Sequence, residues 1–195
     1  MSNIKSIMIV GVGGQGTLLA SRLLGNVTVA KNFDVKVSEV HGMSQRGGSV
    51  VTYVRYASDE KVCSPVIDKG QADFIISFEK LEGARWLDYL KKGGKLITST
   101  QELEPMPVIT GVMEYPSNLI EKIKDKGIDV LAIDALTLAE EAGSSKATNV
   151  VLMGVLSNFL DIDEKIWDNA ICECVPAKFL EINKKAFELG KNANK

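Results

Sequence analysis

The sequence predicts an α/β fold, in which a mostly parallel open sheet carries helices on both faces and a hairpin-like excursion adds antiparallel strands. Apolar runs of strand length alternate with longer segments of helical periodicity, and a glycine-rich turn follows the first run. The chain has 195 residues and contains neither an internal repeat nor a low-complexity tract. These observations favour one domain that covers residues 1–195.

The first half of the chain opens with a strand and a helix. Residues 4–10, IKSIMIV, form a continuous apolar run that is typical of a buried parallel strand. A helix is expected over residues 15–31, along which four apolar residues recur at helical spacing: Leu19, Leu23, Val27 and Ala30. The chain should then form two strands and, after a turn, a short third strand that pairs back as a hairpin: 35–40, 50–56 and 61–63.

The second half continues the alternation. Three more strands are expected, at 72–78, 95–100 and 130–134, and five more helices, at 79–90, 117–126, 136–142, 149–160 and 177–189. Gly93–Gly94 should end the first of these helices and Ser117 should cap the second, while Pro105 and Pro107 indicate a loop between them. Helix 149–160 is apolar on nearly all sides, so we expect it to be buried or covered by a partner or a second copy.

Composition narrows the classes of function. The net charge of −2 and the isoelectric point near 5.6 argue against a nucleic-acid-binding protein. The chain has no apolar run of about 18 residues, so no membrane span is expected. The three cysteines, Cys63, Cys172 and Cys174, form no CxxC pair, which argues against a disulfide framework and against a four-thiolate metal site. A cytoplasmic location is the natural expectation.

A glycine loop, GVGGQG, follows the first predicted strand. Gly11, Gly13 and Gly16 match the G-x-G-x-x-G pattern, in which the backbone amides at a helix N-terminus hold an anion. Glu39 stands about where a dinucleotide-binding fold places the acidic residue for the ribose. Three interpretations remain open, namely a bound NAD or FAD, another anion, and a purely structural turn.

A second loop, His41–Ser49, is the most unusual segment of the chain. It contains the only histidine, and Arg46 lies beside Gly47 and Gly48. A guanidinium beside two glycine amides suits a carboxylate or phosphate. The simpler interpretation is a surface loop with one solvated arginine and a structural His41. This loop also crowds the place where an adenosine ribose would lie, which weakens the dinucleotide interpretation.

The two loops together resemble a known family. GVGGQG, then VSEVHGMSQRGGSVVTYVR, then SPVIDKGQADFIISFE, are similar in order and spacing to the gamma-type domain of the pyruvate and 2-oxoacid:ferredoxin oxidoreductases. The form HGMSQRGGSV is most similar to the indolepyruvate type. NVVLMGVLSNFL and EINKKAFELG also resemble the family, so the likeness runs from about Ile4 to Gly190.

The resemblance implies a small subunit that is not catalytic alone. The implied enzyme oxidatively decarboxylates 2-oxoacids, here arylpyruvates, transfers the acyl group to coenzyme A and reduces ferredoxin. Thiamine diphosphate, Mg and 4Fe–4S clusters are then expected on the large catalytic subunit, with no cofactor bound tightly by this chain. The sequence agrees, since it has no GDG segment and no C-x₂-C-x₂-C run. Ferredoxin is reached through the complex, and the isolated chain is expected to be able to dimerise.

Two hypotheses of different class therefore remain: this subunit, or a free-standing NAD- or FAD-binding protein of the Rossmann type. No catalytic residue and no metal ligand is predicted. The residues expected to contact a ligand or a partner belong to the two loops: Gly11, Gly13, Gly14, Gln15, Gly16, Thr17, His41, Ser44, Gln45, Arg46, Gly47, Gly48 and Ser49.

Overall fold

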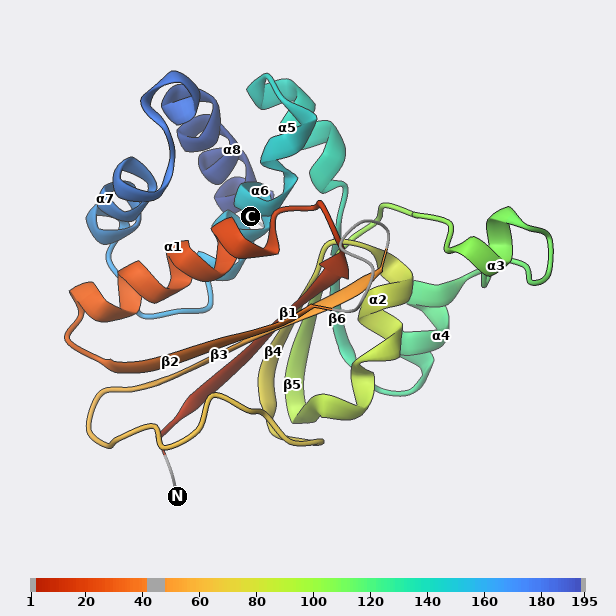
Figure 1. Cartoon of the computed structure of the whole chain (residues 1–195), viewed down its shortest axis with the longest axis horizontal. Helices are drawn as coiled ribbons and strands as arrows, with labels where there is room; N and C mark the ends of the chain where they lie inside the picture. The colour runs from red at the N-terminus through yellow and green to blue at the C-terminus, as the bar shows by residue number, and fades with distance from the viewer. Residues whose placement is uncertain (1–2, 42–47, 194–195) are drawn as a thin grey trace.

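The centre of the molecule is a six-stranded sheet (Figure 1), in a computed structural model that describes residues 3–41 and 48–193. Its strands are β1 (Lys5–Val12), β2 (Asp34–His41), β3 (Ser49–Ala57), β4 (Ala72–Ser77), β5 (Leu90–Ser99) and β6 (Asp129–Ile133). They lie in the order β2-β3-β1-β4-β5-β6. Five strands run in the same direction, and β3 alone runs opposite to them, so the predicted, mostly parallel sheet is confirmed.

The hairpin-like excursion exists, but its strands differ from the prediction. Strand β3 pairs with β2 on one side and with β1 on the other, each time over eight residues. Residues 61–63, expected to pair with 50–56, form no strand. Instead the amide of Val62 donates to the carboxylate of Asp34 at 2.7 Å, which ties this segment to the start of β2.

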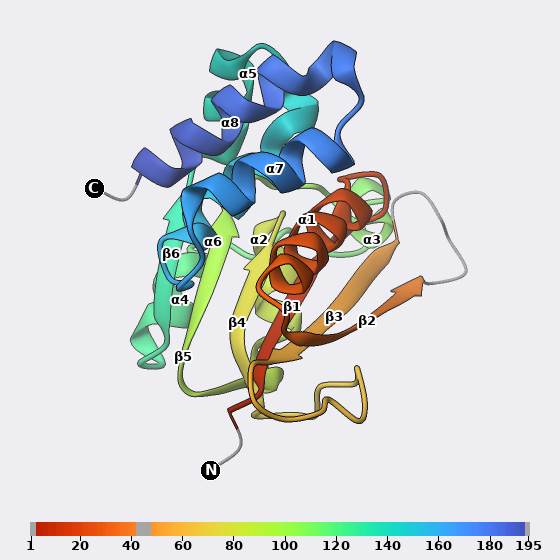
Figure 2. The same ribbon diagram turned by 90° about the vertical axis from the view of Figure 1, so that its left-hand side faces the viewer.

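Helices cover both faces of the sheet, as predicted (Figure 2). On one face lie α1 (Thr17–Ala30), α5 (Ala135–Ala142), α6 (Thr148–Ser157), α7 (Glu164–Cys174) and α8 (Leu180–Asn192). On the other face lie α2 (Lys80–Arg85) and α4 (Leu119–Asp125). Strand β1 contributes side chains to the hydrophobic cores on both faces of the sheet. Ile7 and Ile9 lie in the core beneath α1 and α6, and Met8 and Val10 lie in the core on the face of α2 and α4. Within the part of the chain described, no helix is long and apolar enough to cross a membrane.

Helix α6 is buried by its own chain. Nine of its ten residues are buried, and α8 packs across it. A Cβ atom placed on Gly154 would lie 2.1 Å from the carbonyl oxygen of Phe187, and one on Gly190 would lie 1.9 Å from that of Val151. The two helices therefore touch backbone to backbone, which only glycine permits. Of the two expected alternatives, burial of this helix is confirmed, and α8 supplies the cover. A partner or second copy is therefore not needed to keep α6 from water.

Three local predictions need correction. The helix expected over 79–90 ends at Arg85 and continues as a short 3₁₀ helix, η1 (Leu87–Tyr89). The Gly93–Gly94 pair does not end it but lies inside β5, where the pairing with β4 shifts register and a side chain at Gly94 would meet the carbonyl oxygens of Ala72 and Asp73 at 3.0 Å. Helix α4 begins after Asn118, in the left-handed conformation, so Ser117 is not its cap.

Four further elements lay outside the predictions. Helix α7 was not expected, although its apolar residues face the core. A short helix, α3 (Met106–Ile109), forms in the proline-containing segment that was expected to be a loop, because prolines are tolerated in a first helical turn. Two more 3₁₀ helices, η2 (Ser145–Ala147) and η3 (Ala177–Phe179), precede α6 and α8.

Candidate anion-binding site

The glycine loop joins β1 to α1 as predicted and leaves amides at the helix N-terminus available. Gly14 and Gly16 adopt left-handed conformations, with φ of 104° and 86°, and Gly16 is the N-cap residue of α1. No residue in the described ranges accepts a hydrogen bond from the amides of Gly14, Gly16, Thr17 or Leu18. Unsatisfied amides at the positive end of a 14-residue helix favour an anion.

Two of the glycines are required by close approach. A side chain at Gly16 would place its Cβ 2.3 Å from the side-chain nitrogen of Asn149, which donates to the Gly16 carbonyl at 3.0 Å. A Cβ at Gly11 would lie 2.9 Å from the side-chain oxygen of Gln15 and 3.3 Å from Phe78. Gly14 has open space around it, so its positive φ is the only constraint there. Part of the glycine pattern is therefore structural.

Gln15 holds the loop in place with its side chain. Its oxygen accepts from the amide of Val12 at 2.8 Å, and its nitrogen donates to the carbonyl of Phe78 at 3.1 Å and to the side chain of Gln101 at 3.3 Å. These contacts join the ends of β1, β4 and β5. The Gln15 side chain is thus engaged within the chain, and its contribution to the site is the shape of the loop.

The second loop ends beside the first, whereas it begins at the end of β2, one strand further from β1. The amide of Gly13 donates to the carbonyl of Gly48 at 2.8 Å, and Ser49 pairs with Val12 where β3 meets β1. His41 ends β2 as a strand residue. Ser44, Gln45, Arg46 and Gly47 lie outside the described residues. The two loops that the sequence singled out are thus brought together at their bases.

A cavity of about 510 Å³ opens at the glycine loop. Its lining residues come from β1–α1, from the ends of β4 and β5, and from η2 and the start of α6: Gly14, Gln15, Gly16, Leu19, Phe78, Gln101, Leu103, Leu136, Ser145, Lys146, Thr148 and Asn149. Lys146 is the one charged side chain among these lining residues, and it is exposed. A lysine opposite a helix N-terminus gives the cavity two sources of positive potential.

Sequence reasoning missed the far wall of this cavity. Ser145, Lys146 and Asn149 follow Gln15 by about 130 positions, and no local motif connects them to it. A usable signal lay in the sequence SSKATN itself, since hydroxyl, amide and lysine side chains there directly precede an apolar helix. Only the parallel sheet brings this segment next to the glycine loop, because the ends of parallel strands share one edge.

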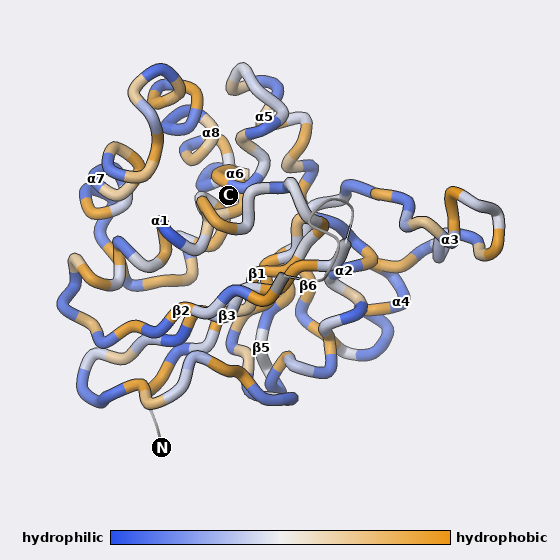
Figure 3. The backbone as a smooth tube through the Cα atoms, viewed as in Figure 1, coloured by the Kyte–Doolittle hydropathy of each residue, from blue (hydrophilic) through white to orange (hydrophobic). Residues whose placement is uncertain are grey.

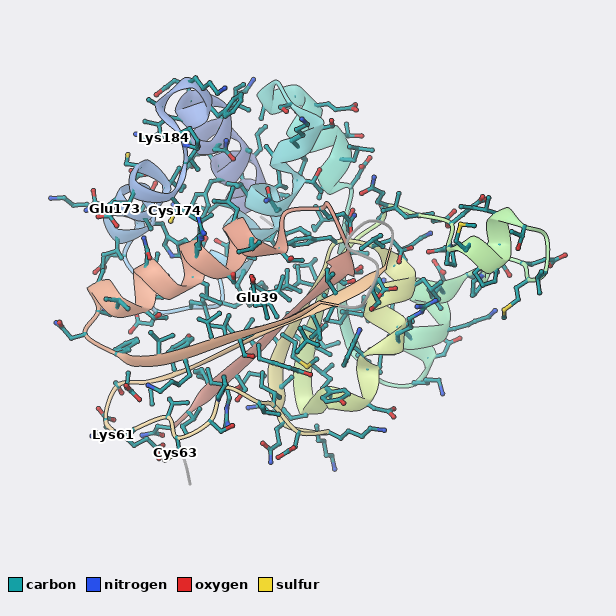
Figure 4. The ribbon with its side chains drawn as sticks, in the orientation of Figure 1. Glu39, Lys61, Cys63, Glu173, Cys174 and Lys184 are labelled. Carbon is teal, nitrogen blue, oxygen red and sulfur yellow. The ribbon has the colours of Figure 1, made fainter. Side chains whose placement is uncertain are left out.

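Glu39 does not occupy a dinucleotide site. Strand β3 lies between β2 and β1, so the strand that carries Glu39 is not the neighbour of β1. Glu39 points toward α1 (Figure 4), where Ser21 donates to its carboxylate at 3.1 Å. The NAD or FAD interpretation, which used Glu39 to hold a ribose beside the glycine loop, is not supported.

A smaller cavity of about 290 Å³ lies next to Ser49 and contains two buried glutamates. Glu79 caps α2 by accepting from the amide of Glu82, and the Glu82 carboxylate accepts from the Ser49 hydroxyl at 2.5 Å and lies 3.3 Å from Arg85. Burial raises the pKa of the Glu82 carboxyl above its usual value, against the opposing effects of Ser49 and Arg85. Glu82 therefore joins the second loop's end to α2.

The cysteines lie apart and are free. Cys63 is exposed beyond β3, and Cys172 and Cys174 are on α7 at the other side of the molecule (Figure 4). Across residues 3–41 and 48–193, no three histidine, cysteine or acidic side chains are grouped to hold a metal ion.

Comparisons with known proteins agree on one family. The family described as pyruvate ferredoxin/flavodoxin oxidoreductase matches residues 6–193. The indolepyruvate oxidoreductase subunit IorB of Thermococcus kodakarensis is 44% identical over 97% of this chain and 96% of its own length. The subunit IorB of Pyrococcus horikoshii is 43% identical, with the same coverage of both chains.

Two solved structures share the fold. A keto/oxoacid ferredoxin oxidoreductase gamma subunit from Geobacter sulfurreducens has a TM-score of 0.68 at 22% identity and covers 95% of each chain. A 2-oxoglutarate:ferredoxin oxidoreductase from Magnetococcus marinus, with 2-oxoglutarate, coenzyme A and succinyl-CoA bound, has a TM-score of 0.75 at 20% identity. The match covers 98% of this chain and 31% of that one, so the same fold also occurs as part of a longer polypeptide.

Proposed function

Since this chain belongs to the pyruvate ferredoxin/flavodoxin oxidoreductase family, we propose that it is the small subunit of an indolepyruvate:ferredoxin oxidoreductase. The enzyme would oxidatively decarboxylate arylpyruvates to acyl-CoA and reduce ferredoxin. Near-complete coverage by two indolepyruvate oxidoreductase subunits supports this substrate class over other 2-oxoacids. The complex is expected in the cytoplasm.

We assign the oxidative decarboxylation and the electron transfer to the large subunit. Thiamine diphosphate, Mg and the 4Fe–4S clusters would reside on the large subunit, since the separated cysteines of this chain offer no thiolate set for a cluster. Ferredoxin would receive electrons there. This chain would then contribute binding and positioning, not a catalytic residue.

The contribution of this chain is an anion site for coenzyme A. The observation that carries this proposal is the 510 Å³ cavity lined by Gly14 and Gly16 at the N-terminus of α1 and by Lys146 on another wall. Among the described residues, nothing accepts a hydrogen bond from the amides of those two glycines. Phosphate groups bind well where a helix N-terminus and a basic side chain face the same space. Coenzyme A carries several phosphates, and the apolar side chains of the lining, Leu19, Phe78, Leu103 and Leu136, suit the rest of such a molecule.

The second loop would complete the site. Its end at Gly48 contacts Gly13 of the glycine loop, and Arg46 precedes Gly48 by two positions in the sequence. Arg46 would add a second cation for coenzyme A or for the carboxylate of the oxoacid. The alternative role for Arg46 is an ion pair with a carboxylate that only holds the loop.

The test uses the co-expressed complex of both subunits. Lys146→Ala should raise the KM for coenzyme A about tenfold, since a charge-assisted contact contributes roughly 1.5–3 kcal/mol, without changing subunit association. Arg46→Ala should raise the KM for coenzyme A or for indolepyruvate by a similar factor. Lys124→Ala, an exposed lysine on α4, is the control. Viologen reduction by indolepyruvate and coenzyme A gives the readout.

Two results would contradict the proposal. If the large subunit alone reduces viologen at the full rate, this chain is not a working subunit of that enzyme. If both variants keep the wild-type KM values in an intact complex, the cavity does not bind coenzyme A and the glycine loop is structural.

A further inference from the structure

A projecting arm, residues 102–116, exposes four large apolar side chains. It leaves the body between β5 and α4 and carries α3 at its end (Figure 1). Met106, Ile109, Val112 and Met113 are 67%, 61%, 77% and 63% exposed. Hydrophobic residues colour the tip of this arm where it stands free of the rest of the chain (Figure 3). A group of exposed apolar side chains on one projection is typical of a protein–protein interface.

The tip of the arm is shaped by its own backbone. Helix α3 begins after Pro105, and the chain turns back at Gly111, whose φ of 72° only glycine adopts easily. The amides of Val112 and Met113 both donate to the carbonyl of Pro107, at 2.9 and 3.0 Å. The four apolar side chains are therefore held on a backbone turn that is already formed, and this turn loses little conformational entropy on binding.

The base of the arm is fixed to the edge that holds the glycine loop. The Tyr115 hydroxyl donates to Glu79, which is 1% exposed, and the amide of Leu103 donates to the same carboxylate at 3.4 Å. Lys80 pairs with Glu102. Residues next in sequence complete the connection, since Gln101 bonds the side chain of Gln15. The arm and the anion cavity thus belong to one rigid edge of the sheet.

Charge indicates what the arm can contact. It contains Glu102, Glu104 and Glu114 and neither lysine nor arginine. Glu104 and Glu114 are exposed and have no ion-pair partner among the described residues. Two arms packed against each other would bring these carboxylates together, which opposes a contact between two copies through their arms. An apolar cleft with a basic rim is complementary to the arm.

We propose that the arm is the docking element by which this chain binds the large subunit, inserting Met106, Ile109, Val112 and Met113 into an apolar cleft rimmed by lysine or arginine. The inference rests on the proposed function, which supplies the large subunit as partner. Docking at the base of the anion cavity would hold that cavity facing the partner. Apolar side chains on a rigid projection are the type of contact that dominates interface energy.

The experiment measures association of the purified small subunit with the large subunit. Ile109→Asp combined with Val112→Asp should weaken the Kd by about a hundredfold, because two central contacts are lost and charge is buried. Val29→Asp combined with Val66→Asp is the matched control, since those valines are 57% and 50% exposed on other parts of the surface. The control should bind like wild type. Equal melting temperatures for all three proteins establish that the variants are folded.

A second pair of variants tests the basic rim. Glu104→Lys combined with Glu114→Lys should weaken association about tenfold at low salt and less at high salt, because exposed charge pairs are screened. Wild-type affinity in both arm variants would overturn the inference while leaving the proposed function intact.

Two other outcomes would also contradict the proposed docking role of the arm. If the arm variants bind the large subunit normally but convert a self-associated small subunit into a monomer, the occupant is a second copy and the inference is wrong. If the wild-type chain does not bind the large subunit, the proposed function and the docking role fail together.

Discussion

Helix α6 and the arm are both rich in large apolar side chains, but their surroundings are opposite. Nine of the ten residues of α6 are buried, whereas four apolar side chains of the arm are more than 60% exposed. Because α6 is apolar on nearly all sides, the sequence left two alternatives for it, burial in the core or cover by a partner or second copy. The structure shows that α6 is covered by α8, and that the exposed apolar group lies on a segment where the sequence indicated only a loop at Pro105 and Pro107.

The difference lies in which glycines face which backbone. Gly154 and Gly190 let α6 and α8 approach until a side chain at either position would overlap a carbonyl oxygen. The arm has no such partner within the described chain, and its Gly111 serves only a turn. Apolarity alone therefore does not locate an interface; the availability of an internal partner decides it.

The largest effect should come from breaking the α6–α8 contact. Gly154→Ala places a methyl group 2.1 Å from the carbonyl oxygen of Phe187, and backbone cannot move aside as a side chain can. The free energy of unfolding should fall by about 3 kcal/mol, at the high end for overpacking. Urea denaturation measures it.

Gly25→Ala in α1 is the control for this substitution, since its nearest neighbour would be 3.9 Å away. The free energy of unfolding of the Gly25→Ala control should rise by about 0.5–1 kcal/mol, because alanine has a higher helix propensity than glycine. A fully stable Gly154→Ala protein would show that α6 and α8 do not pack this closely, and would restore the case for a partner over α6.

An intermediate effect on stability should come from Glu82, a buried carboxyl group beside the base of the arm. The raised pKa of Glu82 means that its protonated form is favoured in the folded state. The stabilisation from that proton is therefore present at low pH and is lost as pH rises through the folded pKa. The Glu82→Gln side chain mimics the neutral acid. The free energy of unfolding of this variant, relative to that of wild type, should therefore be higher at pH 8 than at pH 4.

Urea denaturation across pH measures this difference. Glu114→Gln, on the exposed arm, controls for removing one negative charge. A Glu82→Gln stability difference that stays constant from pH 4 to pH 8 would contradict the assigned direction of the shift.

The smallest effect should come from the arm tip in the isolated chain. Val112→Ser should change stability by no more than about 0.5 kcal/mol, because the side chain is 77% exposed. The same substitution at Val150 in α6, which is 0% exposed, should cost about 3 kcal/mol by removing methyl contacts and burying a hydroxyl. Thermal unfolding of the pair measures the contrast directly. Equal losses would mean that the arm tip packs on the chain itself.

Much of this architecture was predictable because it depends on local pattern. The apolar run before GVGGQG predicted β1, and the helical spacing after it predicted α1. The position of β3 was not predictable, because the alternating segment 50–56 fits an antiparallel strand whether its neighbours are β1 and β2 or residues 61–63. That ambiguity also allowed Glu39 to be placed beside the glycine loop.

The candidate site was predictable on one side only. The glycine loop and the second loop have distinctive local composition, and their bases do meet at Gly13 and Gly48. Lys146 reaches the cavity only because β6 and α5 carry the chain back over the carboxyl edge of the sheet. Such long-range placement follows from strand order, which periodicity does not encode.

The α6–α8 contact also orders events during synthesis. Helix α6 leaves the ribosome before α8, so the apolar side chains that α8 covers remain open until residues 180–192 have been made. The core on that face also includes Ile7 and Ile9 of the first strand, so it joins residues from both ends of the sequence. The nascent chain thus carries an uncovered apolar surface from the synthesis of α6 until that of α8. Such a surface is open to contacts with other chains until α8 packs on it.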